Sequence, residues 1–177
     1  MGFLKNKKVL ILGLLSDRSI AYGIASSMKK QGAELAFTYQ MEKHKERVKK
    51  LASHFDSNIV LPCDVAKDED IKNLFPLLEK EWGNFDILIH SIAFVPKEAL
   101  SGDFIESTTR ENFIIAHNIS SYSFTALAKS AVPYLNKNSS LLTLSYLGAE
   151  RTMPNYNVMG LAKASLEANV KYMSHSL

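Results

Sequence analysis

Tyr156 and Lys163 are the two residues of this sequence whose types and spacing best suit proton-transfer chemistry. On a helix, seven steps of roughly 100° return to within about 20° of the same face. A phenol and an ammonium group would therefore point in one direction, two turns apart. Tyr146 follows an apolar run just before them, so the three side chains form a candidate proton-donor site. The alternative is that Tyr156 and Lys163 are ordinary residues of an amphipathic helix.

Short apolar runs that predict strands alternate with segments that predict helices. The predicted strands are Lys8–Leu12, Glu34–Tyr39, Asn58–Pro62, Asp86–His90 and Ser140–Leu144. The first predicted helix begins near Ser19 and stops at Gly32, and the later ones cover Met41–His54, Asp68–Trp82, Thr109–Leu135 and Asn155–His175. This alternation predicts an α/β fold in which right-handed βαβ crossovers build a doubly wound parallel sheet of order 3-2-1-4-5.

Residues of interest follow the predicted strand ends, namely Gly13, Gln40, Asp64, Ser91 and Tyr146. In doubly wound sheets the carboxyl ends of the strands border the ligand crevice. The clustering therefore favours a nucleotide site over a chance arrangement of polar residues.

The turn between the first strand and the first helix lacks a G-x-G-x-x-G fingerprint, but it occupies the position where a pyrophosphate meets helix N–H groups. Gly13 would allow the tight turn, and Gly23 would allow close packing of helix on strand. Ser19 would offer its hydroxyl to a phosphate. It also suits a plain helix N-cap, and the two roles are compatible.

Gln40 follows the second predicted strand. At this position an acid would bind the ribose of NAD and a base would pair the 2′-phosphate of NADP. Lys43 is the nearest cation in the sequence. Asp64 and Val65 follow the third strand, where the acid could accept from an adenine amino group. Asp64 could equally cap the next helix.

Composition excludes several classes of protein. The formal net charge of +3 is too small to indicate nucleic-acid binding. A lone cysteine, Cys63, excludes an internal disulfide framework and suits a buried position in a reducing compartment. We expect no transmembrane helix and no signal peptide. His90 and His117 are too isolated to predict a metal site.

Together these motifs resemble the bacterial NADH-dependent enoyl-acyl-carrier-protein reductases, a divergent branch of the short-chain dehydrogenases with a Rossmann-type fold. The resemblance covers the whole chain. It is carried by Ser19–Ile24, Gly32–Gln40, Cys63–Val65, His90–Ile92, Ala116–His117, Ile119–Phe124 and, most specifically, Leu141–Lys171. As in that family, six residues separate the tyrosine from the lysine, in contrast to the usual Tyr-x-x-x-Lys.

The resemblance implies a role for each matching residue. The cofactor NADH would be lined by Gly13, Ser19, Ile20, Gln40, Asp64, Val65 and Ile92. Tyr156 would stabilise the enolate, Lys163 would hold the nicotinamide ribose, and Tyr146 would flank the substrate near Val95. Val95 replaces the alanine usual in the family, so we expect a narrower acyl pocket. The partners implied are an acyl carrier protein bearing an enoyl chain and further copies in a homotetramer, in the cytoplasm.

We therefore expect a single NAD-binding domain over residues 1–177 that reduces enoyl thioesters in fatty-acid synthesis. Family members continue through two further strands and the loop that covers the nicotinamide, so we expect the working protein to extend beyond Leu177. Two alternatives stay open. One is a 3-oxoacyl or carbonyl reductase of the same superfamily, and the other is a nucleotide-binding fragment without turnover.

Overall fold

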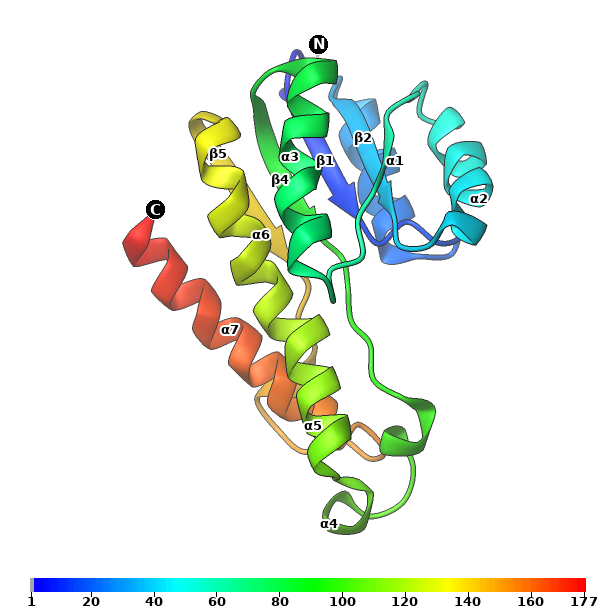
Figure 1. Ribbon diagram of the computed structural model, residues 1–177, viewed down its shortest axis with the longest axis vertical. Coiled ribbons are helices and arrows are strands. Elements are labelled where there is room, and N and C mark those ends of the chain that lie inside the picture. Colours follow the sequence, from blue (N-terminus) through cyan, green and yellow to red (C-terminus); the bar gives the residue numbers. More distant parts are fainter. Residues whose placement is uncertain (1) are drawn as a thin grey trace. The chain divides into compact units, whose positions relative to one another are not determined.

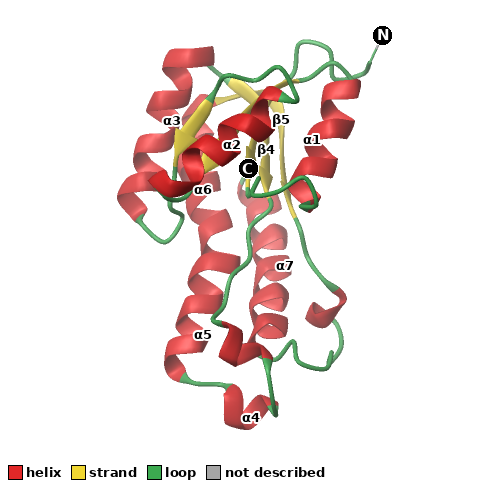
Figure 2. Ribbon diagram, turned by 90° about the vertical axis from the view of Figure 1, so that its right-hand side faces the viewer, coloured by secondary structure: helices red, strands yellow, loops and turns green. Residues whose placement is uncertain are grey.

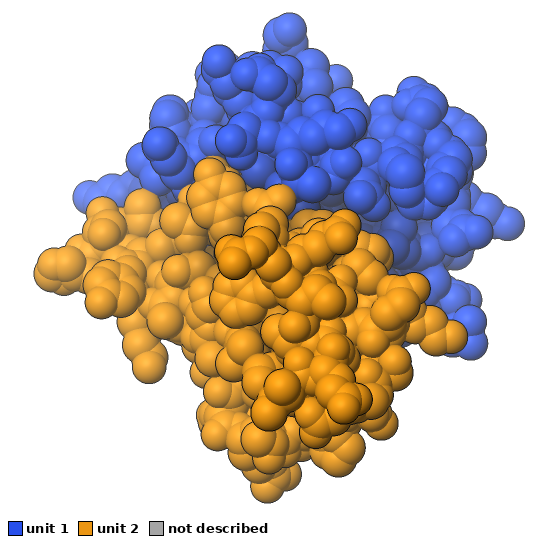
Figure 3. Space-filling view, turned by 60° about the horizontal axis from the view of Figure 1, so that its bottom comes forward, with its two compact units in different colours: residues 1–91, 128–143 blue, residues 92–127, 144–177 orange. Residues whose placement is uncertain are grey.

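The computed structural model describes residues 2–177, which divide into two compact units (Figure 3). Unit 1 comprises Met1–Ser91 and Ala128–Thr143, and unit 2 comprises Ile92–Leu127 and Leu144–Leu177. No helix of the described chain is both long and apolar enough to cross a lipid bilayer.

Unit 1 is built on one parallel sheet of order β3-β2-β1-β4-β5, which confirms the predicted fold class and strand order. Its strands are β1 (Lys8–Leu12), β2 (Glu34–Tyr39), β3 (Val60–Pro62), β4 (Phe85–His90) and β5 (Leu135–Thr143). The helices that connect the first four strands are α1 (Ile20–Lys30), α2 (Glu42–Ser53) and α3 (Asp68–Trp82).

Helices cover both faces of this sheet, with α1 and α3 on opposite sides (Figures 1 and 2). On the α1 face, Ala21 and Ala25 share a buried cluster with Val9, Ile11 and Phe37. Leu10 and Leu12 alternate with these β1 residues and are also fully buried. The continuous apolar runs of the sequence thus have their origin in strands that are buried on both faces.

Unit 2 is largely helical. It contains η1 (Lys97–Leu100), α4 (Phe104–Ser107), α5 (Arg110–His117), the π-helical segment η2 (Asn118–Tyr122), η4 (Leu147–Ala149) and α7 (Val158–Ser176). The boundary between the units falls within α6 (Ser123–Ala131), which is followed by η3 (Val132–Tyr134).

The prediction of one regular helix over Thr109–Leu135 was wrong. The π-helical segment η2 interrupts it, and the last α-helical residue is Ala131, two residues before Pro133. Ser123 donates a hydrogen bond of 2.7 Å to the carbonyl oxygen of Ile119, a back-bond that bends helices. The strand that follows begins at Leu135, earlier than predicted. The prediction missed its first half because those residues are polar, and their pairing with β4 is irregular.

The start of the last helix was also predicted too early. Helix α7 begins at Val158, so Tyr156 lies in the preceding turn. Asn155 and Asn157 have φ angles of 58° and 42°, and residues in this left-handed region cannot continue a right-handed helix. The argument that Tyr156 and Lys163 share one helix face therefore fails.

Candidate functional site

Gly13 forms the turn after β1 in a conformation that only glycine adopts easily. Its φ is +100°, and a Cβ atom built on it would lie 2.0 Å from the carbonyl oxygen of Ser91. Glycine is therefore needed at this position both for its φ angle and because the Ser91 backbone fills the place of a side chain. The tight turn that the sequence predicted at the end of β1 is therefore present.

Ser19 caps α1, as predicted. Its Oγ atom accepts a hydrogen bond from the Tyr22 amide at 3.2 Å and donates one to the Ser16 carbonyl at 2.7 Å. The first turn of α1 carries no acidic residue that would repel an anion, and Ile20 beside the cap is exposed. The predicted role of Gly23 was wrong: a Cβ atom there would meet open space, so the glycine is not needed for packing.

The ends of β2 and β3 bring Gln40 and Asp64 together. Gln40 Nε2 donates to Asp64 Oδ1 at 3.3 Å, and the same oxygen accepts from the Ala66 amide at 3.2 Å. Val65 beside them is buried. The alternative that Asp64 caps α3 is wrong, because the N-cap position belongs to Lys67.

Cys63 precedes this pair and is buried, as expected. Burial raises the pKa of its thiol to about 12, and the charges of Asp70 and Asp64 add to the shift. The thiol therefore stays protonated and is a poor nucleophile at neutral pH.

In unit 2, the rings of Tyr146 and Tyr156 lie together, with centroids 4.7 Å apart. Burial raises the pKa of the Tyr156 phenol, and the neighbouring Tyr146 raises it further. A Cβ atom on Gly148 would lie 2.4 Å from Tyr156 Cδ1, so this glycine gives the Tyr156 ring its space. The result is a protonated phenol whose ring position is confined, as a hydrogen-bond donor requires.

Lys163 lies in α7 and is 5% exposed. Its Nζ atom donates a hydrogen bond of 2.6 Å to the carbonyl oxygen of Leu144, at the start of the segment that carries Tyr146. Burial lowers the pKa of this ammonium group. The structure therefore places the lysine, the strand-end segment and both tyrosines in one unit.

Asn157 is a residue of this region that the sequence analysis missed. Its Nδ2 atom lies within hydrogen-bond reach of Ser107 Oγ at 2.9 Å, the Ala99 carbonyl at 3.2 Å and the Gly102 carbonyl at 3.4 Å. It holds the turn that carries Tyr156 against the η1–α4 segment. Asparagines on both sides of Tyr156 were the available signal, because asparagine tolerates left-handed turns.

Val95 packs in a buried cluster with Ala99, Val158 and Ala162, and Tyr156 lies partly buried against the same cluster. Ile92 is half-buried. A cleft of about 350 Å³ adjoins Tyr156 and is also lined by Phe104, Met153 and Leu161. The surroundings of the Tyr156 phenol are thus mainly apolar.

No group of three or more histidine, cysteine or acidic side chains within residues 2–177 is arranged to hold a metal ion. His90 Nδ1 lies 2.9 Å from Thr143 Oγ1, and His117 Nδ1 lies 3.0 Å from the Phe113 carbonyl oxygen. Unit 1 contains the turn, cap and strand-end residues that the sequence predicted for a dinucleotide. Unit 2 contains Tyr146, Tyr156 and Lys163.

Comparison with known proteins identifies the family to which the chain is similar. The enoyl-(acyl carrier protein) reductase family profile matches residues 13–177. The chain is 60% identical, over all 177 residues, to the enoyl-(acyl-carrier-protein) reductase (NADH) of Haemophilus influenzae, of which it spans 68%. The solved enoyl-(acyl-carrier-protein) reductase (NADH) of Aquifex aeolicus superposes with a TM-score of 0.96 at 50% identity, over 99% of this chain and 69% of that one. The Bacillus cereus enoyl-acyl carrier protein reductase, solved with NADP+, gives the same TM-score at 43% identity, over 100% of this chain and 69% of that one.

Proposed function

Because the chain belongs to the enoyl-(acyl carrier protein) reductase family, we propose that it reduces the trans-2 double bond of enoyl-acyl-carrier-protein thioesters with NADH, the last step of the fatty-acid elongation cycle. The observation that carries this proposal is the Tyr156 phenol, kept protonated and fixed against Tyr146 in the same unit as the buried Lys163.

When bound, NADH supplies the hydride that adds to the β-carbon of the enoyl thioester. Negative charge then develops on the thioester oxygen, and the Tyr156 phenol donates a hydrogen bond to that oxygen. Because this bond strengthens only as charge appears, it lowers the barrier rather than merely binding substrate. The raised pKa of Tyr156 supports this role, since a phenolate could not donate.

Lys163 has a different role in the proposal, that of holding the nicotinamide ribose. Its ammonium group is buried and already oriented by the Leu144 carbonyl, so little side-chain freedom is lost when further acceptors arrive. In the same proposal Gly13, Ser19, Ile20, Gln40, Asp64, Val65 and Ile92 bind the cofactor. The turn after β1 and the Gln40–Asp64 pair are the features that support this assignment.

The acyl chain is assigned to the apolar surroundings of Tyr156. Val95 belongs to the cluster against which Tyr156 packs, so its extra bulk relative to alanine acts on the wall of the proposed acyl site. In the same proposal Tyr146, whose ring contacts that of Tyr156, flanks the substrate. The proposal also includes acyl carrier protein as the carrier of the substrate and a single NAD-binding domain over residues 1–177. It further includes a homotetrameric assembly and a cytoplasmic location.

The alternatives lose support. A 3-oxoacyl or carbonyl reductase would be expected to show Tyr-x-x-x-Lys, whereas six residues separate Tyr156 from Lys163. A nucleotide-binding role without turnover gives no reason for a confined, protonated phenol beside a second tyrosine.

The test is to add crotonyl thioester to the purified protein with NADH and to follow the loss of reduced-nicotinamide absorbance. Saturated thioester formed in proportion to NADH consumed is the expected result. Consumption of NADH with a 3-oxoacyl thioester but not with the enoyl thioester would establish the alternative reductase. Binding of NADH without consumption of either substrate would establish the nucleotide-binding role.

A further inference from the structure

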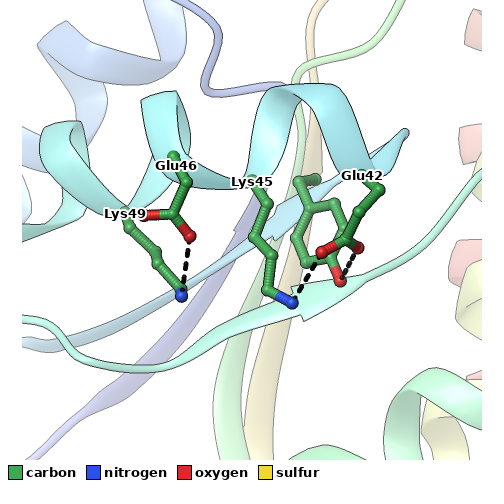
Figure 4. Close-up of polar contacts among 5 residues, drawn as sticks. Glu42, Lys45, Glu46 and Lys49 are labelled. Atoms are coloured by element: carbon green, nitrogen blue, oxygen red, sulfur yellow. Dashed lines mark hydrogen bonds and ion pairs between the residues drawn. The ribbon is translucent and has the colours of Figure 1, made fainter.

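Glu42 joins two side chains near the carboxyl end of β2 (Figure 4). Its Oε2 atom accepts a hydrogen bond of 3.0 Å from the hydroxyl of Tyr39, the last residue of β2. Its Oε1 atom accepts one of 2.8 Å from Lys45 Nζ, which also lies 5.6 Å from the centre of the Tyr39 ring. Both carboxylate oxygens are thus engaged, and the cation is held over the tyrosine.

The Tyr39–Glu42–Lys45 group lies where the second strand ends. In doubly wound folds the residues that follow the second strand meet the adenosine ribose, where a base pairs a 2′-phosphate and an acid repels it. Gln40 at this strand end is neutral and is bound to Asp64. Lys45 is therefore a cation close in the chain to the expected position of the ribose, and Glu42 already neutralises it.

We propose that Glu42 is a specificity-determining residue that keeps Lys45 from pairing with a 2′-phosphate and so makes the protein prefer NADH to NADPH. The inference rests on the proposed use of a nicotinamide dinucleotide by this chain. It goes beyond that proposal because it assigns the discrimination between NADH and NADPH to the Glu42 carboxylate, which pairs with Lys45. A 2′-phosphate would meet the charge of Glu42 and would have to compete with it for Lys45.

Other charged groups of α2 do not share this arrangement. Lys43 and Arg47 are exposed on the same helix. Glu46 pairs with Lys49 at 2.9 Å and the same i, i+3 spacing, one turn further along (Figure 4). The Glu46–Lys49 pair therefore offers a matched control with the same chemistry away from the strand end.

The experiment is to titrate the wild-type protein, Glu42→Gln and Glu46→Gln with NADH and NADPH by fluorescence at one salt concentration. The ratio of the two dissociation constants is the readout, and it cancels any general loss of binding. We expect Glu42→Gln to shift this ratio toward NADPH by about tenfold, the effect of one charge-assisted hydrogen bond. Glu46→Gln should leave the ratio at its wild-type value.

A second variant tests the assigned cation. Adding Lys45→Met to Glu42→Gln should return the ratio toward the wild-type value, because the phosphate ligand is then lost. A wild-type ratio in Glu42→Gln, or an equal shift in Glu46→Gln, would overturn the inference while leaving the proposed function intact. Absence of binding of either cofactor to the wild-type protein would instead overturn the proposed function, and the inference with it.

Discussion

The rings of Tyr146 and Tyr156 lie 4.7 Å apart between centroids and are inclined at 59°. The two phenols are not equivalent, because Tyr146 is 47% exposed whereas Tyr156 is half-buried between this ring and Gly148. Burial and the neighbouring Tyr146 raise the pKa of Tyr156, and Gly148 leaves its ring little room to move. We therefore expect proton donation from Tyr156 and a flanking role for Tyr146.

Tyr156→Phe should slow the chemical step by about 10²–10⁴-fold, the usual contribution of a positioned proton donor. The affinity for NADH should change little, because the phenol acts where charge develops on the substrate. Single-turnover reduction of crotonyl thioester and a separate NADH titration measure the two effects. Tyr146→Phe is the control, and a larger loss of rate in that variant would reassign the donor.

The rate should also respond to alkaline pH in a direction set by Tyr156. Burial, reinforced by Tyr146, raises the pKa of its phenol above the ordinary value of 10.0. The donor therefore stays protonated through neutral and mildly alkaline pH, and the chemical step should weaken only as pH rises beyond about 10. Single-turnover rates across this range measure the effect. A fall in rate centred near neutral pH and absent from Tyr156→Phe would contradict this assignment.

Lys163→Ala should weaken NADH binding itself. A buried charged donor is worth about 1.5–3 kcal/mol when it meets an acceptor, so the dissociation constant should rise roughly ten- to hundredfold. Fluorescence titration of NADH checks this, with circular dichroism to confirm that α7 remains folded. Normal NADH affinity combined with lost turnover would show that the lysine serves the chemical step instead.

Replacement by alanine should have opposite effects on stability at Gly13, in the turn after β1, and at Gly23, within α1. Gly13→Ala places a methyl group 2.0 Å from the Ser91 carbonyl oxygen at a φ of +100°, so we expect loss of stability and of NADH binding. Gly23→Ala puts the methyl group into open space on a helix and should stabilise the protein by about 0.5–1 kcal/mol. Denaturant unfolding of both variants measures the difference. Equal effects would contradict the role given to the turn.

The sheet and its order were predictable because each inner strand is buried on both faces and therefore appears in the sequence as an apolar run. The polar first half of β5 carries no such signal, and its pairing with β4 is irregular. The π-helical segment η2 interrupts the long helix, and Ser123 donates a hydrogen bond to Ile119 there. Bonds of this kind leave no periodic pattern in the sequence.

The candidate site was predictable by residue type but not by local geometry. Spacing placed Tyr156 and Lys163 on one helix face, yet left-handed Asn155 and Asn157 keep Tyr156 in a turn. Likewise Lys43 was the nearest cation in the sequence, but the pairing of Lys45 with Glu42 depends on rotamers and on the Tyr39 hydroxyl. Contacts that depend on single side chains leave no repeating pattern in the sequence, so they could not be predicted from it.

Asn157 combines a strained backbone with side-chain contacts to the η1–α4 segment of unit 2. Its φ of 42° costs about 1–3 kcal/mol for a residue other than glycine. The two Nδ2 hydrogens offset this cost by donating to acceptors among the Ala99 and Gly102 carbonyl oxygens and Ser107 Oγ. Asn157→Ala removes these bonds but keeps the strain, so we expect a loss of roughly 1–3 kcal/mol in the free energy of unfolding. Asn157→Gly should recover about 1 kcal/mol of that loss by relieving the strain, yet both variants should reduce thioesters slowly, since Tyr156 is then held less firmly. Urea unfolding and single-turnover rates compare the two. If Asn157→Ala proves as stable and as active as the wild-type protein, the bonds to the η1–α4 segment do not position the phenol.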